Sequence, residues 1–112
     1  MSDCVFCKII AKQIKADIVY EQDGVVAFND LYPKYKTHVI IIPVKHLVSV
    51  AEMQEADDEL VGKLMRIGAK IARERGLENG GYRLLTNIGV NAGQTVQHLH
   101  IHLLGGEKLR PL

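Results

Sequence analysis

A run of histidines near the C-terminus constrains this chain more than any other feature. His98, His100 and His102 alternate with single aliphatic residues, and three of the five histidines in the 112-residue chain fall here, so chance placement is a weak explanation. Because successive side chains of a strand point to opposite faces, the run predicts a strand over residues 96–104 with three imidazoles on one face. At about 3.3 Å per residue, the outer imidazoles start about 13 Å apart. That separation argues against one metal ion bound by all three histidines and favours a separate role for each.

The segment before this strand is rich in glycine and small polar residues. Gly93, Gln94 and Thr95 lead almost directly into the histidine run. Glycine lets backbone N–H groups point at an anion, and the Thr95 hydroxyl adds a donor. Such a loop is by itself more often an ordinary turn, but beside imidazoles it predicts a site for phosphate oxygens. A neutral imidazole can attack phosphorus or act as a general base, and its neighbours can stabilise the charge that develops.

Hydrophobic periodicity predicts a single α+β domain over residues 1–112, with one antiparallel sheet of about five strands packed against one main helix. Asp23-Gly24 between β-forming residues indicates a hairpin, and the β-branched run ended by Pro43 indicates a strand buried on both faces. The expected elements are a short helix at 5–10, strands at 18–20, 25–28 and 38–42, a helix at 55–75, a strand at 82–86, a loop at 88–94 and the histidine strand at 96–104.

Composition and charge argue against several classes of function. A formal net charge of +1 provides no basic surface for duplex nucleic acid. No segment approaches the roughly 20 apolar residues of a membrane span. The N-terminal segment that begins with Met1, Ser2 and Asp3 lacks the basic-then-apolar layout of a signal peptide, which predicts a cytoplasmic protein.

The two cysteines, Cys4 and Cys7, form a C-x-x-C pair. In a reducing compartment this spacing indicates half of a metal site or two thiols rather than a structural disulfide. A thioredoxin-like redox role is another use of such a pair. Here the pair precedes every predicted strand, which argues against that role.

The seven residues from His98 to Leu104 fit the pattern H-φ-H-φ-H-φ-φ, with φ apolar, and so resemble the signature of the histidine triad (HIT) superfamily. Gly105-Gly106 resembles the branch of histidine triad nucleotide-binding proteins rather than the diadenosine polyphosphate hydrolases. The resemblance implies a HIT-like fold and a homodimer in which two sheets form one continuous ten-stranded sheet. It extends over essentially the whole chain and includes Phe28 to Asp30, Thr37 to Pro43, Lys45-His46 and Gly93 to Val96.

For function, the resemblance implies a hydrolase of purine nucleoside 5′-phosphoramidates, in which AMP is joined to an amine. His100 would be the nucleophile that forms a nucleotidyl-histidine, His102 would contact the α-phosphate, and His38 would assist His100. The related nucleotidylyl transferases usually have glutamine as the third residue of the triad, so His102 favours water as the final acceptor. Two alternatives stay open: hydrolysis of a dinucleoside polyphosphate, and a nucleotide- or zinc-binding interaction module with little turnover.

The resemblance also assigns nucleotide contacts outside the triad. The assigned residues are Gly93, Gln94, Thr95 and Asn87 for the phosphate, Asp30 and Leu31 for the ribose, and Phe6, Ile9 and Phe28 for the base. Structural alternatives stay open: Asp30 could cap a turn, Asn87 could be a turn residue at a strand end, and Phe6, Ile9 and Phe28 could belong to the core. His38, at the head of an apolar strand, could be a buried structural histidine.

A structural zinc ion is the last expectation from the resemblance. The expected ligands are Cys4, Cys7, His46 and His98, which would leave His100 free for a reaction that needs no metal. Two thiolates and two imidazoles suit tetrahedral zinc, and the alternative is two thiols with two surface histidines. The C-terminal segment, residues 107–112, departs from the bulky or basic ending usual in the family, so the resemblance leaves the leaving-group selectivity open.

Overall fold

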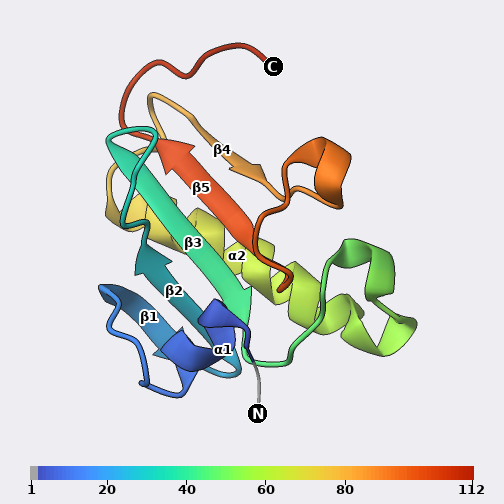
Figure 1. The fold of residues 1–112 in the computed structure, drawn as a ribbon. Coiled ribbons are helices and arrows are strands. Elements are labelled where there is room, and N and C mark those ends of the chain that lie inside the picture. The colour runs from blue at the N-terminus through green and yellow to red at the C-terminus, as the bar shows by residue number, and fades with distance from the viewer. Residues whose placement is uncertain (1–2) are drawn as a thin grey trace.

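Five antiparallel strands make up one sheet in the computed structural model, which describes residues 3–112 (Figure 1). Met1 and Ser2 lie outside the described residues. They begin the N-terminal segment in which the sequence predicts no signal peptide. The strands follow the order β1-β2-β3-β5-β4 across the sheet, and the predicted α+β class and element order are confirmed. The elements are α1 (Val5–Ile10), β1 (Ile18–Gln22), β2 (Val25–Asn29), β3 (Thr37–Pro43), η1 (Val50–Glu52), η2 (Glu55–Asp57), α2 (Asp58–Glu74), β4 (Tyr82–Leu85), η3 (Val90–Ala92) and β5 (Ile101–Gly105).

β1 and β2 form the hairpin that the sequence predicts. Asp23 (φ 54°) and Gly24 (φ 80°) both have positive φ. Two such residues in a row produce a turn whose twist matches that of antiparallel strands. The turn pairs Gln22 with Val25 and so starts the register of the hairpin.

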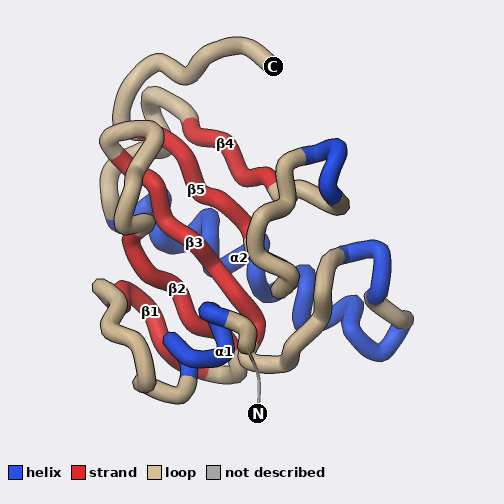
Figure 2. Tube along the Cα trace, in the orientation of Figure 1, coloured by secondary structure: helices blue, strands red, loops and turns tan. Residues whose placement is uncertain are grey.

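Helices lie on both faces of the sheet, but α1 covers only part of its face (Figure 2). α2 packs on one face, where its Leu64 and Ile67 are fully buried. α1 lies on the other face and buries Phe6 and Ile9 against residues of β2 and β3. Because the residues of β3 alternate between these two layers, every residue of that strand is buried, as its unbroken apolar run predicts.

α2 begins three residues later than predicted, at Asp58 instead of residue 55. The residues Glu55–Asp57 form a short 3-10 turn before it. The side chain of Asp57 is held there by Lys45 Nζ at 2.6 Å. The predicted C-terminal stop is confirmed, because Gly76 adopts a left-handed backbone conformation (φ 73°) directly after the helix.

The histidine strand is shorter than predicted. β5 begins at Ile101, so His102 alone of the three triad histidines lies in a strand, and the expected start at residue 96 is wrong. The alternation of faces nevertheless holds along the whole run. Leu99, Ile101 and Leu103 all pack in the core layer beneath α2.

Pro43 explains why the strand starts late. Ile41 of β3 pairs with Ile101, and two residues further along β3 lies Pro43, which has no N–H group to donate to a ladder. The chain therefore leaves the sheet at this point. The backbone N–H of Leu99 donates instead to the carbonyl of Leu47, over 2.6 Å.

The sheet has two edge strands, β1 and β4. A ten-stranded sheet requires one of these edges to pair with its copy in a second chain, and this arrangement stays a prediction. Within residues 3–112, no helix combines the length and apolar character that a membrane span requires.

We expect the two glycines of α2 to respond in opposite directions to the same substitution. A Cβ at Gly68 would lie 2.8 Å from Leu84 Cδ2 and 3.1 Å from Ile41 Cδ1, whereas a Cβ at Gly62 meets nothing within 4 Å. Gly68→Val should lower the free energy of unfolding by about 1–3 kcal/mol through overpacking. Gly62→Val should raise it by roughly 0.3 kcal/mol, since valine favours a helix more than glycine does.

Urea unfolding of the wild type and both variants measures these changes. Equal unfolding free energies for the two variants would contradict a close approach of α2 to the sheet at Gly68.

Candidate active site and adjacent metal cluster

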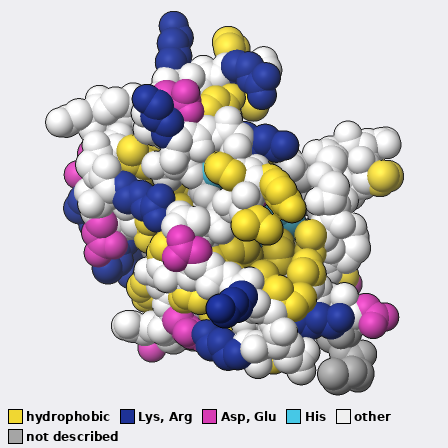
Figure 3. Space-filling model, turned by 60° about the vertical axis from the view of Figure 1, so that its left-hand side comes forward, with side chains coloured by type: hydrophobic (Ala, Val, Ile, Leu, Met, Phe, Trp, Pro, Cys, Tyr) yellow, Lys and Arg dark blue, Asp and Glu magenta, His cyan; other side chains and the backbone are white. Residues whose placement is uncertain are grey.

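The sheet face opposite α2 carries an open cavity of about 590 Å³. His38, His100 and His102 all line it, so the three histidines to which the resemblance gives catalytic roles lie in one site. Histidine surface is visible between apolar side chains in Figure 3, with Lys and Arg side chains around them. The other lining residues are Asp30, Tyr32, Lys34, Tyr35, Arg83, Leu85, Asn87, Gly93, Thr95, Leu104, Arg110 and Pro111.

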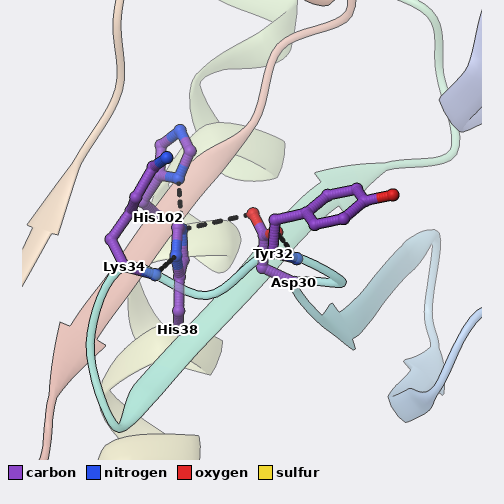
Figure 4. A network of polar contacts seen from close by, with 5 residues as sticks. All are labelled: Asp30, Tyr32, Lys34, His38 and His102. Carbon is purple, nitrogen blue, oxygen red and sulfur yellow. Dashed lines mark hydrogen bonds and ion pairs between the residues drawn. The ribbon is translucent and has the colours of Figure 1, made fainter.

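The register of the sheet brings His38 and His102 together. His38 lies opposite Leu104, and Ile40 lies opposite His102, so the two histidines are diagonal neighbours on one face of β3 and β5. His38 Nε2 and His102 Nδ1 are 2.9 Å apart (Figure 4). Strand pairing therefore accounts for this contact between residues distant in the sequence.

Hydrogen bonds define the proton positions on this pair. The backbone N–H of Lys34 donates to His38 Nδ1 over 3.1 Å, so the proton of neutral His38 lies on Nε2. His38 Nε2–H in turn donates to His102 Nδ1, which places the proton of neutral His102 on its own Nε2. His102 therefore offers one remaining N–H donor, which suits an oxygen of a bound phosphate.

Asp30 connects the loop before β3 to this histidine pair (Figure 4). One carboxylate oxygen accepts a hydrogen bond from the Tyr32 backbone N–H over 2.7 Å. The other oxygen lies 3.4 Å from His38 Nε2. Asp30 thus has the turn-capping contact that the sequence allows, and it also lines the cavity where a ribose contact is expected.

His100 is held by the backbone of the histidine run itself. Its Nδ1–H donates to the His98 carbonyl over 2.7 Å, and the ring of Phe6 meets it edge-on at a centroid distance of 5.1 Å. Thr86 Oγ1 donates to the His100 carbonyl over 2.7 Å and so fixes the backbone on the other side. With Nδ1 committed to a hydrogen bond, the lone pair of neutral His100 lies on Nε2, which is the atom able to attack an electrophile.

Burial keeps these histidines uncharged near neutral pH. It is the largest cause of the lowered pKa of His38, His100 and His102. The pKa of His102 falls to about 4, because the charges of His100 and His38 add to the effect of burial while Asp30 opposes it. Neutral imidazoles retain the lone pairs and N–H groups that the hydrogen bonds above require.

The structure brings part of the predicted nucleotide set to the cavity. Asp30, Asn87, Gly93 and Thr95 line it, whereas Leu31 is 80% exposed and is not a lining residue. The roles of all these residues toward a nucleotide stay predictions.

Gln94 and the three apolar residues assigned to the base lie elsewhere. The buried Gln94 side chain accepts from the Gly89 N–H over 2.9 Å and donates to the Val48 carbonyl over 2.6 Å, so it ties two loops together. The remaining residues, Phe6, Ile9 and Phe28, pack with aliphatic residues in the layer beneath α1. Their contact with a base stays a prediction.

Sequence reasoning missed the charged and aromatic residues at one end of the cavity. Lys34, Tyr35, Arg83 and Arg110 line it, and the Tyr35 hydroxyl accepts from the backbone N–H and Nε–H of Arg110 at 3.2 and 3.3 Å. The unusual C-terminal segment, residues 107–112, was the one sequence feature that could have drawn attention to Arg110. Nothing in the sequence pattern singles out the other three.

The four residues expected to bind a metal lie together. One ligand atom from each of Cys4, Cys7, His46 and His98 lies within 4.8 Å of all the others. His98 Nδ1 is 3.4 Å from Cys4 Sγ, 3.6 Å from Cys7 Sγ and 3.1 Å from His46 Nδ1. Metal bonds of about 2.0–2.3 Å give a zinc tetrahedron edges of about 3.3–3.8 Å. The cluster therefore has the composition and size of a tetrahedral metal site.

His98 connects the metal cluster to the cavity. Its Nε2–H donates to the Pro43 carbonyl over 2.8 Å, so its Nδ1 faces the cysteines with a lone pair. Its own carbonyl accepts the hydrogen bond from His100. One fully buried residue thus orients a metal ligand with its side chain and the cavity histidine with its backbone.

Alternating histidines that lead into β5, the last of them diagonal to a histidine of neighbouring β3, form the arrangement of a histidine triad site. The comparisons with known proteins agree with this class. A family described as "Scavenger mRNA decapping enzyme C-term binding" matches residues 3–109. The chain belongs to the histidine triad (HIT) family.

Similar proteins cover nearly the whole chain. A purine nucleoside phosphoramidase of Escherichia coli (strain K12) is 40% identical over 110 residues, which are 98% of this chain and 92% of that protein. A HIT family hydrolase from Clostridium thermocellum has 43% identity and a TM-score of 0.95, over 100% of this chain and 97% of the other. A histidine triad protein from Clostridium difficile has 39% identity and the same TM-score and coverage. The predicted HIT-like fold is confirmed.

We expect the stability of the protein to fall on acidification partly through His102. Its folded pKa of about 4 lies below the ordinary unfolded value of about 6.5, so the unfolded state binds more protons between these two pH values. Acid therefore favours unfolding over that window. His102→Gln should remove up to about one of the protons taken up on unfolding.

Urea unfolding at a series of pH values from 7.5 to 4.5 measures this difference, and the region above pH 7 serves as the internal control. Parallel stability curves for the wild type and His102→Gln below pH 6.5 would show that this histidine is not held neutral by the fold.

Proposed function

We propose that this chain hydrolyses purine nucleoside 5′-phosphoramidates by cleaving the P–N bond between AMP and an amine. The observation that carries the proposal is the 2.7 Å hydrogen bond from His100 Nδ1–H to the His98 carbonyl, which leaves Nε2 as the nucleophilic atom of a cavity residue. The name of the Escherichia coli relative, a purine nucleoside phosphoramidase, supports the same substrate class.

In the first step, His100 Nε2 donates its lone pair to phosphorus and a new P–N bond forms. The P–N bond to the amine breaks, and the amine nitrogen keeps the bonding pair and takes a proton from water. The negative charge that builds on the phosphate oxygens would be stabilised by the remaining N–H of His102 and by the loop at Gly93 and Thr95.

In the second step, a water oxygen attacks phosphorus and releases a proton to solvent. The bond from phosphorus to His100 Nε2 breaks, and the imidazole recovers its lone pair. AMP leaves, and the hydrogen bond from His100 Nδ1–H to the His98 carbonyl is kept throughout. The hydrogen bond from Lys34 to His38 keeps His102 in the same tautomer throughout.

His100→Asn tests this mechanism. The variant should lose hydrolysis of AMP joined to tryptamine by about 10³-fold or more, because asparagine cannot form the covalent intermediate. It should still bind AMP with a Kd within about threefold of the wild type, since the phosphate donors remain. Turnover is followed by tryptamine release, and AMP binding by calorimetry.

An alkaline quench during turnover should trap the nucleotidyl-histidine intermediate, because N-phosphoryl histidine survives base. Mass spectrometry of the quenched wild type should then show the mass of the chain increased by one nucleotidyl group. Wild type that binds AMP but cleaves no phosphoramidate would sink the proposal and favour the interaction-module alternative. Faster cleavage of diadenosine tetraphosphate than of the phosphoramidate would favour the polyphosphate alternative.

We also propose that zinc occupies the cluster of Cys4, Cys7, His46 and His98 as a structural ion. Thiolate and imidazole donors in a set of four suit zinc, and the contacts of 3.1–3.6 Å among them are close to the edges of a zinc tetrahedron. None of the four lines the cavity, so the bound ion would tie the segment at α1 to the histidine run without touching substrate.

The zinc proposal predicts about one zinc ion per chain in the purified wild type, measured by elemental analysis. Cys7→Ser should lower this content severalfold, and chelation should lower the Tm of the wild type but leave that of Cys7→Ser nearly unchanged. Wild type grown with zinc yet purified without any, or a variant that keeps the full content, would refute a zinc site at these residues.

A further inference from the structure

The cavity carries an excess of positive charge. Lys34, Arg83 and Arg110 line it, and within residues 3–112 Asp30 is the single carboxylate residue of the lining. None of the three cations has a carboxylate within 4 Å in this part of the chain. The ion pairs found there involve instead Lys12, His38, Lys45, Lys70 and Arg73.

The strand register places Arg83 on the cavity face. Arg83 of β4 and His38 of β3 both lie opposite Leu104 of β5, so the three residues form one row across the sheet. Neighbouring strands lie about 4.8 Å apart. The row is two residues beyond His102 along β5, towards the end of the strand farther from His100.

Arg110 reaches the same end of the cavity from the C-terminal segment. Its backbone N–H and Nε–H both donate to the Tyr35 hydroxyl, at 3.2 and 3.3 Å, and its guanidinium carbon lies 6.0 Å from the Tyr35 ring centroid. These hydrogen bonds, followed by the charges of Arg110 and Arg83, lower the pKa of Tyr35. Arg110 thus contacts the phenol oxygen directly, and Arg83 lines the same cavity.

The proposed function assigns other residues to the nucleotide part of the substrate. Base and ribose are uncharged, and the phosphate already has His102 and the loop at Gly93 and Thr95 as donors. The third part of a phosphoramidate is its leaving amine. The unpaired guanidinium groups are therefore left to contact that part of the substrate.

We propose that Arg83 and Arg110, the latter positioned by Tyr35, form a subsite for an anionic leaving group. The chain would accordingly prefer phosphoramidates whose amine carries a carboxylate, as an α-amino acid does. A carboxylate can accept two parallel hydrogen bonds from one guanidinium group, and the Nη groups of Arg110 have no hydrogen bond to other residues in 3–112. This inference rests on the proposed function.

The test compares two nearly isosteric substrates, AMP joined through nitrogen to glycine and AMP joined to glycinamide. The measured quantity is the ratio of kcat/KM for the glycine compound to kcat/KM for the glycinamide compound. Relative to the wild type, this ratio should fall about tenfold in Arg83→Gln and about tenfold in Arg110→Gln. The loss should appear mainly in KM for the glycine compound, with glycinamide turnover little changed. Arg66→Gln, an exposed cation on the far side of the sheet in α2, is the matched control and should keep the wild-type ratio.

A ratio that neither substitution changes would overturn the subsite, as would a ratio that Arg66→Gln lowers equally. Diadenosine tetraphosphate is a third substrate, because its leaving group is anionic through phosphate. If Arg83→Gln and Arg110→Gln slow its cleavage and spare that of the glycine compound, the subsite accepts phosphate and the carboxylate assignment is wrong.

Binding separates this inference from the proposed function. His100→Asn, which cannot turn over substrate, should bind the glycine compound about tenfold more tightly than the glycinamide compound, and adding Arg110→Gln should remove the difference. If the wild type cleaves neither compound and this difference is present, the proposed function fails and the subsite stands. Equal affinities refute the subsite whether or not the wild type is active.

Discussion

The missing N–H group of Pro43 is the constraint on which the site depends. It ends the ladder between β3 and β5, so the histidine run crosses from a loop into the sheet instead of lying flat along it. The carbonyl of the same residue accepts a hydrogen bond from His98 Nε2–H, so the other ring nitrogen of that histidine faces the cysteines. The His98 carbonyl is then available to hold His100. The candidate metal cluster and the proposed nucleophile can consequently lie close together along one short segment.

The parts of the fold that the sequence predicts are those governed by local periodicity. The hairpin follows from Asp23-Gly24, the buried strand from an unbroken β-branched run, and the burial of Leu99 and Ile101 from strict alternation. The predicted start of β5 was wrong because the true start depends on Pro43, which lies far away in the sequence. The predicted start of α2 was three residues too early, because periodicity cannot distinguish a 3-10 turn from the first turn of a helix.

The residues of the candidate site also fall into those that could be predicted from the sequence and those that could not. The triad itself is visible as a pattern, and the metal set and the nucleotide contacts came from a family resemblance. Arg83 and Tyr35 could not be predicted, because their place in the cavity depends on the register of β4 and on a loop fold. The proton positions on His38 and His102 were equally hidden, since a backbone N–H, that of Lys34, determines them and no side-chain pattern reports it.

α1 has only six residues, too few for a helix to be stable alone, and its Phe6 stands edge-on to the rings of both His98 and His100. Arg110, near the other end of the described chain, lies on the cavity. Neither end of the chain is thus a neutral point of attachment: an affinity tag or fluorophore fused close to Cys4 or Arg110 would report on a perturbed site. The hairpin turn at Asp23-Gly24 is exposed and does not line the histidine cavity, which makes it the better position for a label.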